Sequence, residues 1–451
     1  MAKFFITNNK EFARKEKNYL SLSNFELSCT YESDSLYAYS TKKMHIDNCN
    51  YYVNQQDFVI ATGTLLNKDE HSIENILNSF VDIDSFRNAS VGQYAIVRKR
   101  DGEILIWGDE IGVYDVFYFY KDGTFVVSNS LYDMALSLEG LLSINENNLI
   151  ERCFINGILG GETIYNEIFR LSGHEHIQII LGRNDFCIVK EKIHLPFLSS
   201  DNYDEVAKDF ANVMKEKAHV VVKQLGNPDI FMTGGLDARV YLDTYLSLGS
   251  KPTLNYGIGN SLITNTKKTD LDLDKEFMKR FQLSLHTGSW ETPNPVDKDW
   301  SDLVKEYGFF IHIYGGSHNV TNMLSHLSEN ISTFGYGGEL YRNLPWVETM
   351  KKSYFSVEQF VDEYYAPSRL LSALKKPQEF RTHILRKVHW VCEKYGLSPN
   401  KIKREDNVFF FMGDISNVNL LKIAFEKNTV MFIFQDNALC ATVIYSNENW
   451  K

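Results

Sequence analysis

The chain has 451 residues, 44% of them hydrophobic, and a formal net charge of −11. This length suits two or three domains around large cores, and the acidic balance argues against general binding of nucleic acids or anionic membranes. None of the six cysteines form a CxxC pair, so the sequence indicates neither a zinc site nor a disulfide framework. We find no signal peptide and no apolar run long enough to span a bilayer, which predicts a cytoplasmic protein.

Residues 1–195 are predicted to be mostly β-structure with two hairpins. Apolar and polar residues alternate in GQYAIVRKRDGEILIWG around Asp101-Gly102, and again in DVFYFYKDGTFVVSNS around Asp122-Gly123. The Asp-Gly pair suits the positive φ angles of tight hairpin turns. A helical pattern precedes both hairpins, and the apolar residues on its one face are Ile73, Ile76, Leu77 and Phe80.

From residue 196 onward, helix and strand patterns alternate. A helix with apolar residues at helical spacing is stopped by Gly226-Asn227-Pro228. A strand at 229–232, a helix at 238–248 and a strand at 252–259 follow, which predicts a parallel α/β unit with helices on its faces. A further helix is predicted at 380–395. The apolar residues of the first helix are Val206, Phe210, Val213, Met214, Val221 and Leu225.

The stretch 369–404 carries ten Lys or Arg against two Glu, opposite in sign to the whole chain. A basic helix face exposed to solvent is the favoured interpretation. The alternative is a surface that meets a polyanion such as a triphosphate.

Two glycines and a carboxylate follow the strand at 229–232 and open the next helix. Ligands of open parallel sheets bind beyond the carboxyl ends of the strands, and Gly234 and Gly235 would let the backbone approach a ligand closely. The N–H groups of the loop and helix terminus favour an anion, which Asp237 would repel unless a divalent cation lies between them. The pattern indicates a phosphate–Mg²⁺ site. Taken alone, it is more typical of a tight strand-to-helix turn.

A second apolar run, residues 331–343, enters another glycine loop with one carboxylate, Glu339. Two carboxylates from separate strand ends can hold one or two Mg²⁺ ions against a triphosphate. The alternative for Glu339 is an acidic residue at a helix start. The glycines before it are Gly335, Gly337 and Gly338.

These motifs resemble those of the asparagine synthetase family, which also contains β-lactam synthetase and lasso-peptide cyclases. The family's SGGxDS pyrophosphate loop is similar to FMTGGLDAR, and its SGEGSDE motif is similar to FGYGGEL, with Glu339 where the family has Asp. Its adenosine-holding strand and acidic helix are similar to TLNYGIGNS and TDLDLDKEFMKRFQLSLHT. Its glutamine-amidotransferase domain is similar to VGQYAIVRKRDGEILIWGDEIGVYDVFYF, and the resemblance spans about residues 55–445 in the family's order.

The resemblance implies an α/β protein of two domains. Residues 1–195 would form an N-terminal-nucleophile (Ntn) αββα sandwich, an inactive glutamine-amidotransferase-like domain. Residues 196–451 would form a pyrophosphate-loop parallel α/β domain, similar to the adenine nucleotide α hydrolases.

Three positions depart from the family pattern. The family's glutaminase uses a cysteine that is exposed once the initiator Met is removed, whereas Ala2 has no nucleophilic atom, so we expect no glutaminase activity. The loop serine after the aspartate is replaced by Ala238, which removes one hydroxyl contact to phosphate. The family's C-terminal catalytic lysine matches no position, which leaves Lys401, Lys403 and Lys422 undecided.

The implied activity is that of an ATP-dependent amide ligase that releases AMP and pyrophosphate. A carboxylate would be activated as an acyl-adenylate and attacked by an amine, with ring closure to a lactam or macrolactam as the favoured case. The substrate would be a small molecule or peptide that bears both groups. ATP and Mg²⁺ are the implied cofactors, with Asp237 and Glu339 as catalytic residues and metal ligands. The residues expected to bind ATP are Thr233, Gly234, Gly235, Leu236, Asp237, Ala238, Arg239, Tyr256, Gly257, Gly335, Tyr336, Gly337 and Gly338.

Other interpretations stay open. Arg239 and Arg342 are candidates for neutralising phosphate, and each is equally explained as a surface residue. The chain is alternatively a non-catalytic scaffold of the same fold, or an enzyme that amidates a sugar or small acid with free ammonia. A pyrophosphate-loop enzyme acting on tRNA or a nucleobase is favoured only by the basic stretch 369–404. The sequence does not indicate an oligomeric state.

Overall fold

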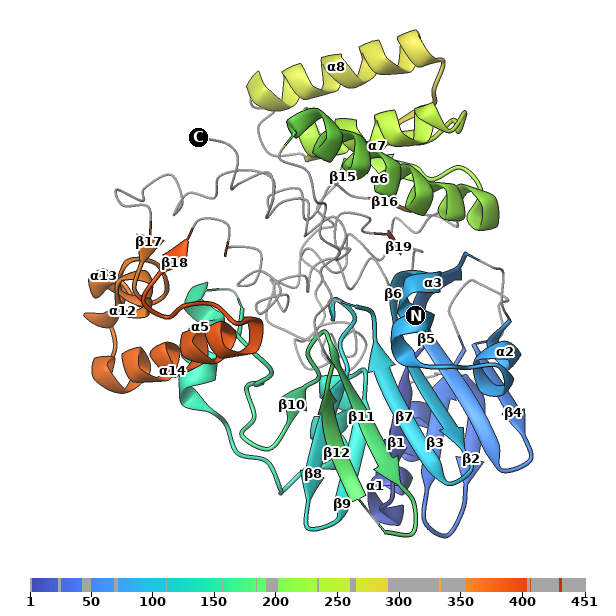
Figure 1. Ribbon diagram of the computed structural model, residues 1–451, viewed down its shortest axis with the longest axis vertical. Helices are drawn as coiled ribbons and strands as arrows, with labels where there is room; N and C mark the ends of the chain where they lie inside the picture. The colour runs from blue at the N-terminus through green and yellow to red at the C-terminus, as the bar shows by residue number, and fades with distance from the viewer. Residues whose placement is uncertain are drawn as a thin grey trace.

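The protein has an N-terminal half built on two antiparallel sheets and a C-terminal half centred on one parallel sheet (Figure 1). A helical unit, residues 354–403, lies beside the N-terminal half at helix α5. In the part of the chain covered, no helix is both long and apolar enough to cross a membrane. The computed structural model describes residues 2–22, 26–42, 50–68, 72–110, 112–155, 157–183, 185–191, 202–232, 235–259, 265–290, 332–333, 354–403, 406 and 430–431.

The first antiparallel sheet has the strand order β10-β8-β9-β1-β3-β2, and the second has the order β12-β11-β7-β6-β5-β4. The strands of the first sheet are β1 (Phe4–Thr7), β2 (Leu27–Glu32), β3 (Tyr37–Thr41), β8 (Phe117–Lys121), β9 (Thr124–Ser128) and β10 (Phe169–Arg170). Those of the second are β4 (Tyr51–Asn54), β5 (Asp57–Asn67), β6 (Ser90–Arg100), β7 (Glu103–Gly108), β11 (Glu175–Ile180) and β12 (Asp185–Lys190).

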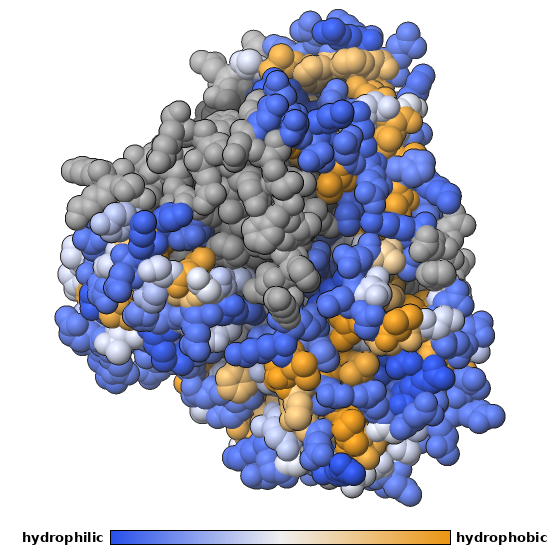
Figure 2. All heavy atoms as spheres, viewed as in Figure 1, coloured by the Kyte–Doolittle hydropathy of each residue, from blue (hydrophilic) through white to orange (hydrophobic). Residues whose placement is uncertain are grey.

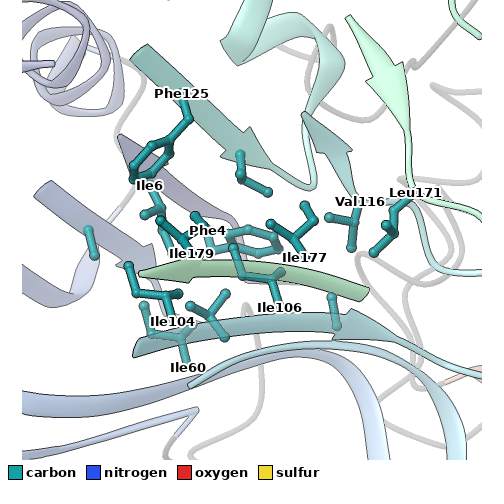
Figure 3. Packing of buried hydrophobic residues seen from close by; sticks show 14 of the residues in the cluster. Phe4, Ile6, Ile60, Ile104, Ile106, Val116, Phe125, Leu171, Ile177 and Ile179 are labelled. Atoms are coloured by element: carbon teal, nitrogen blue, oxygen red, sulfur yellow. The ribbon is translucent and has the colours of Figure 1, made fainter. Parts of the chain in front are cut away.

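The two sheets pack face to face around an apolar core. Phe4 and Ile6 of β1 lie in one buried cluster with Ile106 and Ile177 of the second sheet (Figure 3). Helices α1 and α4 cover the outer face of the first sheet, and α2 and α3 cover that of the second. The expected αββα sandwich is therefore present. The helices of this half are α1 (Lys10–Leu22), α2 (Ile73–Asn78), α3 (Ile83–Ala89), α4 (Leu131–Ser137) and α5 (Glu146–Ile155).

Both predicted hairpins form. Asp101 and Gly102 have φ angles of 51° and 82° between β6 and β7, and Asp122 and Gly123 have 50° and 77° between β8 and β9. Two positive φ angles in succession match the right-handed twist of the flanking strands. Phe80 differs from the prediction because α2 ends at Asn78, but its ring still packs in the same cluster.

The parallel sheet has five strands in the order β15-β14-β13-β16-β19. The predicted helix before it forms and ends at Gly226, which has a φ angle of 83°. The predicted parallel α/β unit is confirmed, whereas the boundary expected at 195/196 falls outside the described ranges and stays a prediction. The elements are α6 (Tyr203–Leu225), β13 (Asp229–Phe231), α7 (Leu236–Ser247), β14 (Thr253–Gly259), α8 (Asn265–Phe281), β15 (Leu285–Trp290), β16 (Ser332–Thr333) and β19 (Val430–Met431).

The helical unit has its own apolar core, in which Phe360, Phe380, Ile384 and Val388 are buried. Its longest helix, α14, begins three residues before the predicted helix at 380–395 and ends before Gly396, whose left-handed conformation closes it. Its elements are β17 (Tyr354–Phe355), α12 (Val357–Phe360), the π-helix η2 (Val361–Tyr365), α13 (Ser368–Leu371), α14 (Pro377–Tyr395) and β18 (Ile402–Lys403).

Candidate functional site

The order of the parallel strands identifies one edge of the sheet as the place for a ligand. The chain runs from β13 outward to β14 and β15, and the later strands β16 and β19 lie on the other side of β13. The direction of winding therefore reverses between β13 and β16. In open parallel sheets, ligands bind beyond the carboxyl ends of the two strands at such a reversal.

The helix that follows β13 begins without a side-chain cap. Helix α7 begins at Leu236, and its N-cap is Gly235, in an extended conformation with φ −66° and ψ 153°. Glycine has no side chain that could accept hydrogen bonds from the first N–H groups of the helix, whereas Asn202 caps α6 and Ser130 caps α4 in that way. A 12-residue helix whose first turn lacks a side-chain cap suits a phosphate group.

The predicted residues of this loop lie around that helix start. Leu236 is 58% exposed, and Asp237 is half-buried in the first turn. Arg239 is exposed, and its Nε donates to the Gly235 carbonyl oxygen at 3.4 Å. Ala238 instead packs in the core with the apolar cluster below the helix, so only its backbone is placed to contact a ligand. Thr233 and Gly234 lie outside the described residues.

The second glycine motif follows β16 directly in sequence, because β16 ends at Thr333. The residues Gly335, Tyr336, Gly337, Gly338, Glu339 and Arg342 all lie outside the described residues. The pairing of Asp237 with Glu339 around a metal therefore stays a prediction. In the described part of the chain, no group of three or more His, Cys, Asp or Glu side chains is arranged to hold a metal ion.

The predicted adenosine-binding residues lie on the strand beside β13. Asn255 pairs with Phe231, so Tyr256 comes immediately after the last pair that β14 makes with β13. Tyr256 is buried, and Gly257 pairs with Gly288 of β15. Both residues lie in the middle of β14 (Thr253–Gly259), just past the level at which the neighbouring β13 ends at Phe231, and so beside the loop after β13.

Two aspartates of α8 interact electrostatically with Tyr256. Asp274 is fully buried, and among the described residues neither oxygen of its carboxyl group has a hydrogen-bond partner. Burial first, and then the charge of Asp270, raises the pKa of Asp274 to about 7. Burial and both aspartates also raise the pKa of the Tyr256 hydroxyl.

A buried carboxyl with a raised pKa beside a candidate ligand-binding residue is typical of a functional site. The sequence drew attention to the acidic helix as a whole but not to Asp274. The available signal was the spacing of Asp270 and Asp274, which puts two like charges on one helix face, an arrangement that destabilises an isolated helix.

The start of β1 is also fixed by polar contacts. The Asn129 side chain accepts a hydrogen bond from the Phe4 N–H at 2.8 Å, and its Nδ2 donates to the Ala2 carbonyl oxygen at 3.1 Å. The same Nδ2 lies 3.0 Å from the Tyr114 hydroxyl oxygen. Ala2 is fully buried, and its methyl group offers no nucleophilic atom in this position.

Comparisons with known proteins give only remote likenesses. No family model and no curated protein matches the chain. A glutamine phosphoribosylpyrophosphate amidotransferase structure from B. subtilis, complexed with ADP and GMP, is 7% identical, with 76% of this chain and 77% of that chain covered and a TM-score of 0.28. A structure of the allosteric regulatory enzyme of purine biosynthesis is 9% identical, with 68% and 88% covered and a TM-score of 0.29. Both scores are too low to bear on the site or the activity.

Proposed function

We propose that the protein is an ATP-dependent ligase that forms an amide bond and releases AMP and pyrophosphate. The observation that carries this proposal is the strand order. The two strands on either side of the reversal, β13 and β16, are the two that the glycine motifs with Asp237 and Glu339 follow in sequence. In sequence, one acidic glycine motif thus follows each of the two strands beyond whose ends parallel sheets bind ligands.

In the proposed reaction, a carboxylate oxygen of the substrate attacks the α-phosphorus of ATP. The bond from this phosphorus to the bridging oxygen breaks, which gives an acyl-adenylate and pyrophosphate. An amine then attacks the acyl carbon, AMP leaves with the electron pair of the C–O bond, and the amine loses a proton. Each step conserves atoms and requires no oxidant or reductant.

The first turn of α7 would hold the leaving pyrophosphate through its backbone N–H groups. Asp237 and Glu339 would hold Mg²⁺, which offsets negative charge on a leaving pyrophosphate when bound. Tyr256 and Gly257 would lie along the adenosine. The N-terminal sandwich would belong to the Ntn amidotransferase-like class without its glutaminase chemistry, since Ala2 cannot form a thioester with glutamine.

The nucleophile would be an amine that the substrate carries or a second amine-bearing molecule. A tethered amine has a large advantage, because well-oriented intramolecular attack reaches effective molarities of about 10⁵ M or more. Ring closure of a small molecule or peptide is therefore the favoured outcome.

A non-catalytic scaffold of the same fold is the second candidate. The observation that favours it is Ala238, whose side chain packs in the core and offers no hydroxyl to a phosphate group. Incubation with ATP and Mg²⁺ across a panel of carboxylates that carry an amine separates the two candidates. A ligase releases AMP and pyrophosphate in equal amounts with at least one compound, whereas a scaffold releases neither.

A further inference from the structure

Helix α14 has a second face beside its buried apolar one. We call this face the polar stripe; its residues recur at helical spacing and are His383, Lys387, Trp390 and Lys394. Lys387 is only 3% exposed, and the side chain of Lys394 is 7% exposed. These two cations lie within the basic stretch 369–404, so neither solvent nor a polyanion is the partner of this part of the stretch.

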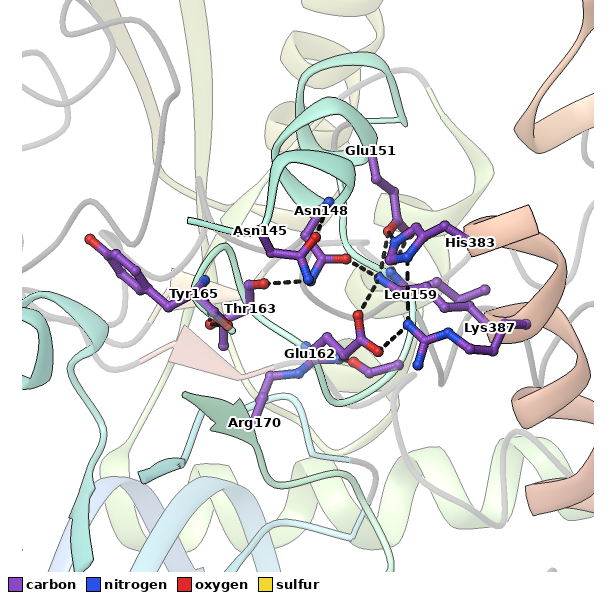
Figure 4. Close-up of polar contacts among 12 residues, drawn as sticks. Asn145, Asn148, Glu151, Leu159, Glu162, Thr163, Tyr165, Arg170, His383 and Lys387 are labelled. Atoms are coloured by element: carbon purple, nitrogen blue, oxygen red, sulfur yellow. Dashed lines mark hydrogen bonds and ion pairs between the residues drawn. The ribbon is translucent and has the colours of Figure 1, made fainter. Parts of the chain in front are cut away.

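The partners of Lys387 come from the N-terminal half. Its Nζ donates to Asn148 Oδ1 at 2.7 Å and to Glu151 Oε2 at 2.5 Å, and it lies 3.5 Å from Glu162 Oε2 (Figure 4). His383 Nε2 lies 3.5 Å from the same Glu151 oxygen. Glu151 is itself fully buried, so the ion pair of Lys387 with Glu151 lies between two side chains that are both shielded from solvent.

The N-terminal half holds these acceptors in place through its own backbone. The Leu159 N–H donates to Glu151 Oε1 at 2.6 Å, and Asn148 Nδ2 donates to the Thr163 carbonyl oxygen at 2.6 Å. Leu159 also packs in the apolar core of the helical unit. Glu151 and Asn148 are thus also held by hydrogen bonds that do not involve α14.

A second contact lies further along the stripe. Lys394 Nζ donates to the Gly173 carbonyl oxygen at 3.2 Å and lies 3.5 Å from Glu175. Between the two lysines, the Trp390 ring covers Gly160, where an added Cβ would lie 3.5 Å from the ring. The stripe therefore meets three separate segments of the N-terminal half.

The N-terminal half also contacts the helix that leads into the parallel sheet. Leu66 and Val91 of its second sheet pack in the core below α6 and α7. Gln224 Nε2 of α6 donates to the Asn67 carbonyl oxygen, and Lys68 forms an ion pair with Glu216. The N-terminal half thus contacts helix α6 of the parallel α/β unit at one place and the helical unit at another (Figure 1).

We propose that the N-terminal half fixes the helical unit relative to the parallel sheet through two separate contacts, one with α6 and one with α14, and that Lys387 is the central residue of the contact with α14. The polar stripe of α14 is then an intramolecular interface. Loss of Lys387 removes the donor that lies 2.5 Å from Glu151 and leaves this buried carboxylate with only the Leu159 N–H and, at 3.5 Å, His383. We therefore expect α14 and α5 to open together as one cooperative unit.

Hydrogen exchange of the full-length protein tests this without any assay of ATP turnover, so its outcome is independent of the proposed ligase activity. In Lys387→Met, we expect exchange in α5 (146–155) and α14 (377–395) to rise together by about 100-fold or more. Exchange in β13 and α7 should stay unchanged. Arg381→Met is the matched control, because Arg381 of the same helix pairs with Asp362 inside the helical unit.

The double variant Glu151→Gln with Lys387→Met removes both charges and should restore most of the lost protection. If Lys387→Met fails to fold while the double variant folds, the proposal is supported in the same way. Unchanged exchange in α5 of the Lys387→Met protein would overturn it. So would equal losses in the single and double variants, or an equal effect of Arg381→Met on α5.

Discussion

Replacing Asp274 with asparagine should stabilise the protein near neutral pH and make its stability less dependent on pH. The wild-type carboxyl is fully buried, and its oxygens have no hydrogen-bond partner among the described residues. Burial and the neighbouring Asp270 raise its pKa from 3.8 to about 7 in the folded state. Asparagine has almost the same shape and cannot acquire the charge.

The direction and size of the effect follow from the two pKa values. A carboxyl whose pKa is higher in the folded state binds its proton more tightly there, so the free energy of unfolding is largest below about pH 4. It then falls as the pH rises towards 7, the folded-state value for Asp274. The difference between the two pKa values corresponds to about 4 kcal/mol. Asp274→Asn should therefore gain up to this amount above pH 7 and almost nothing at pH 4.

Urea unfolding at pH 4.5, 6 and 8 measures the effect. Asp272→Asn is the matched control, since Asp272 is 61% exposed on the same helix and lies 3.5 Å from Lys275. We expect the control to follow the wild type at each pH and Asp274→Asn to diverge from it progressively. If Asp274→Asn lost as much stability as the wild type between pH 4.5 and 8, the inference of a buried, unpartnered carboxyl would be wrong.

Three further predictions concern the loop, the sandwich and the hydrolysis of glutamine. Asp237→Asn should abolish ATP turnover and leave the melting temperature within the error of the wild type, and turnover at the native rate would refute the site assignment. Gly112→Ala should destabilise the sandwich by about 1–3 kcal/mol in urea unfolding, because its φ angle is 71° and an added Cβ would lie 2.6 Å from the Gly173 nitrogen. Gly102 has a φ angle of 82°, but an added Cβ there would have no neighbouring atom within 4 Å, so Gly102→Ala should reduce the free energy of unfolding less. Equal losses of stability in the two variants would contradict the steric reasoning. Incubation of the protein with glutamine should release no more glutamate than a heat-killed control does, since the Ala2 side chain has no nucleophilic atom. Clear release of glutamate would contradict the assignment of the sandwich as an inactive glutaminase domain.

Local sequence signals predicted the elements that depend on local physics. Asp101-Gly102 was enough to predict a hairpin, because two positive φ angles are a property of the turn itself. Gly226-Asn227-Pro228 was enough to predict where α6 ends, since a glycine that tolerates a positive φ angle and a proline two residues later both stop a helix. The parallel α/β unit followed from the alternation of such elements.

The remaining features depend on contacts between distant segments. The pairing of β13 with β16 joins residues about a hundred positions apart, and nothing in either strand specifies it. Lys387 was assigned to a basic face because its neighbours in sequence are basic, whereas its partner Glu151 is 236 residues away. The burial of Asp274 could not be predicted for the same reason, since it depends on the packing of α8 against β14 and β15, which the sequence of α8 does not specify.

The most direct test of the proposed activity is to trap the activated acyl group. Hydroxylamine would be added to the protein with ATP, Mg²⁺ and a carboxylate that supports turnover, and the products followed by mass spectrometry with Asp237→Asn as the negative control. We predict a hydroxamate of the carboxylate and an equal amount of AMP, both absent with Asp237→Asn. Formation of ADP in place of AMP, or a hydroxamate that persists in Asp237→Asn, would contradict adenylate formation at this site.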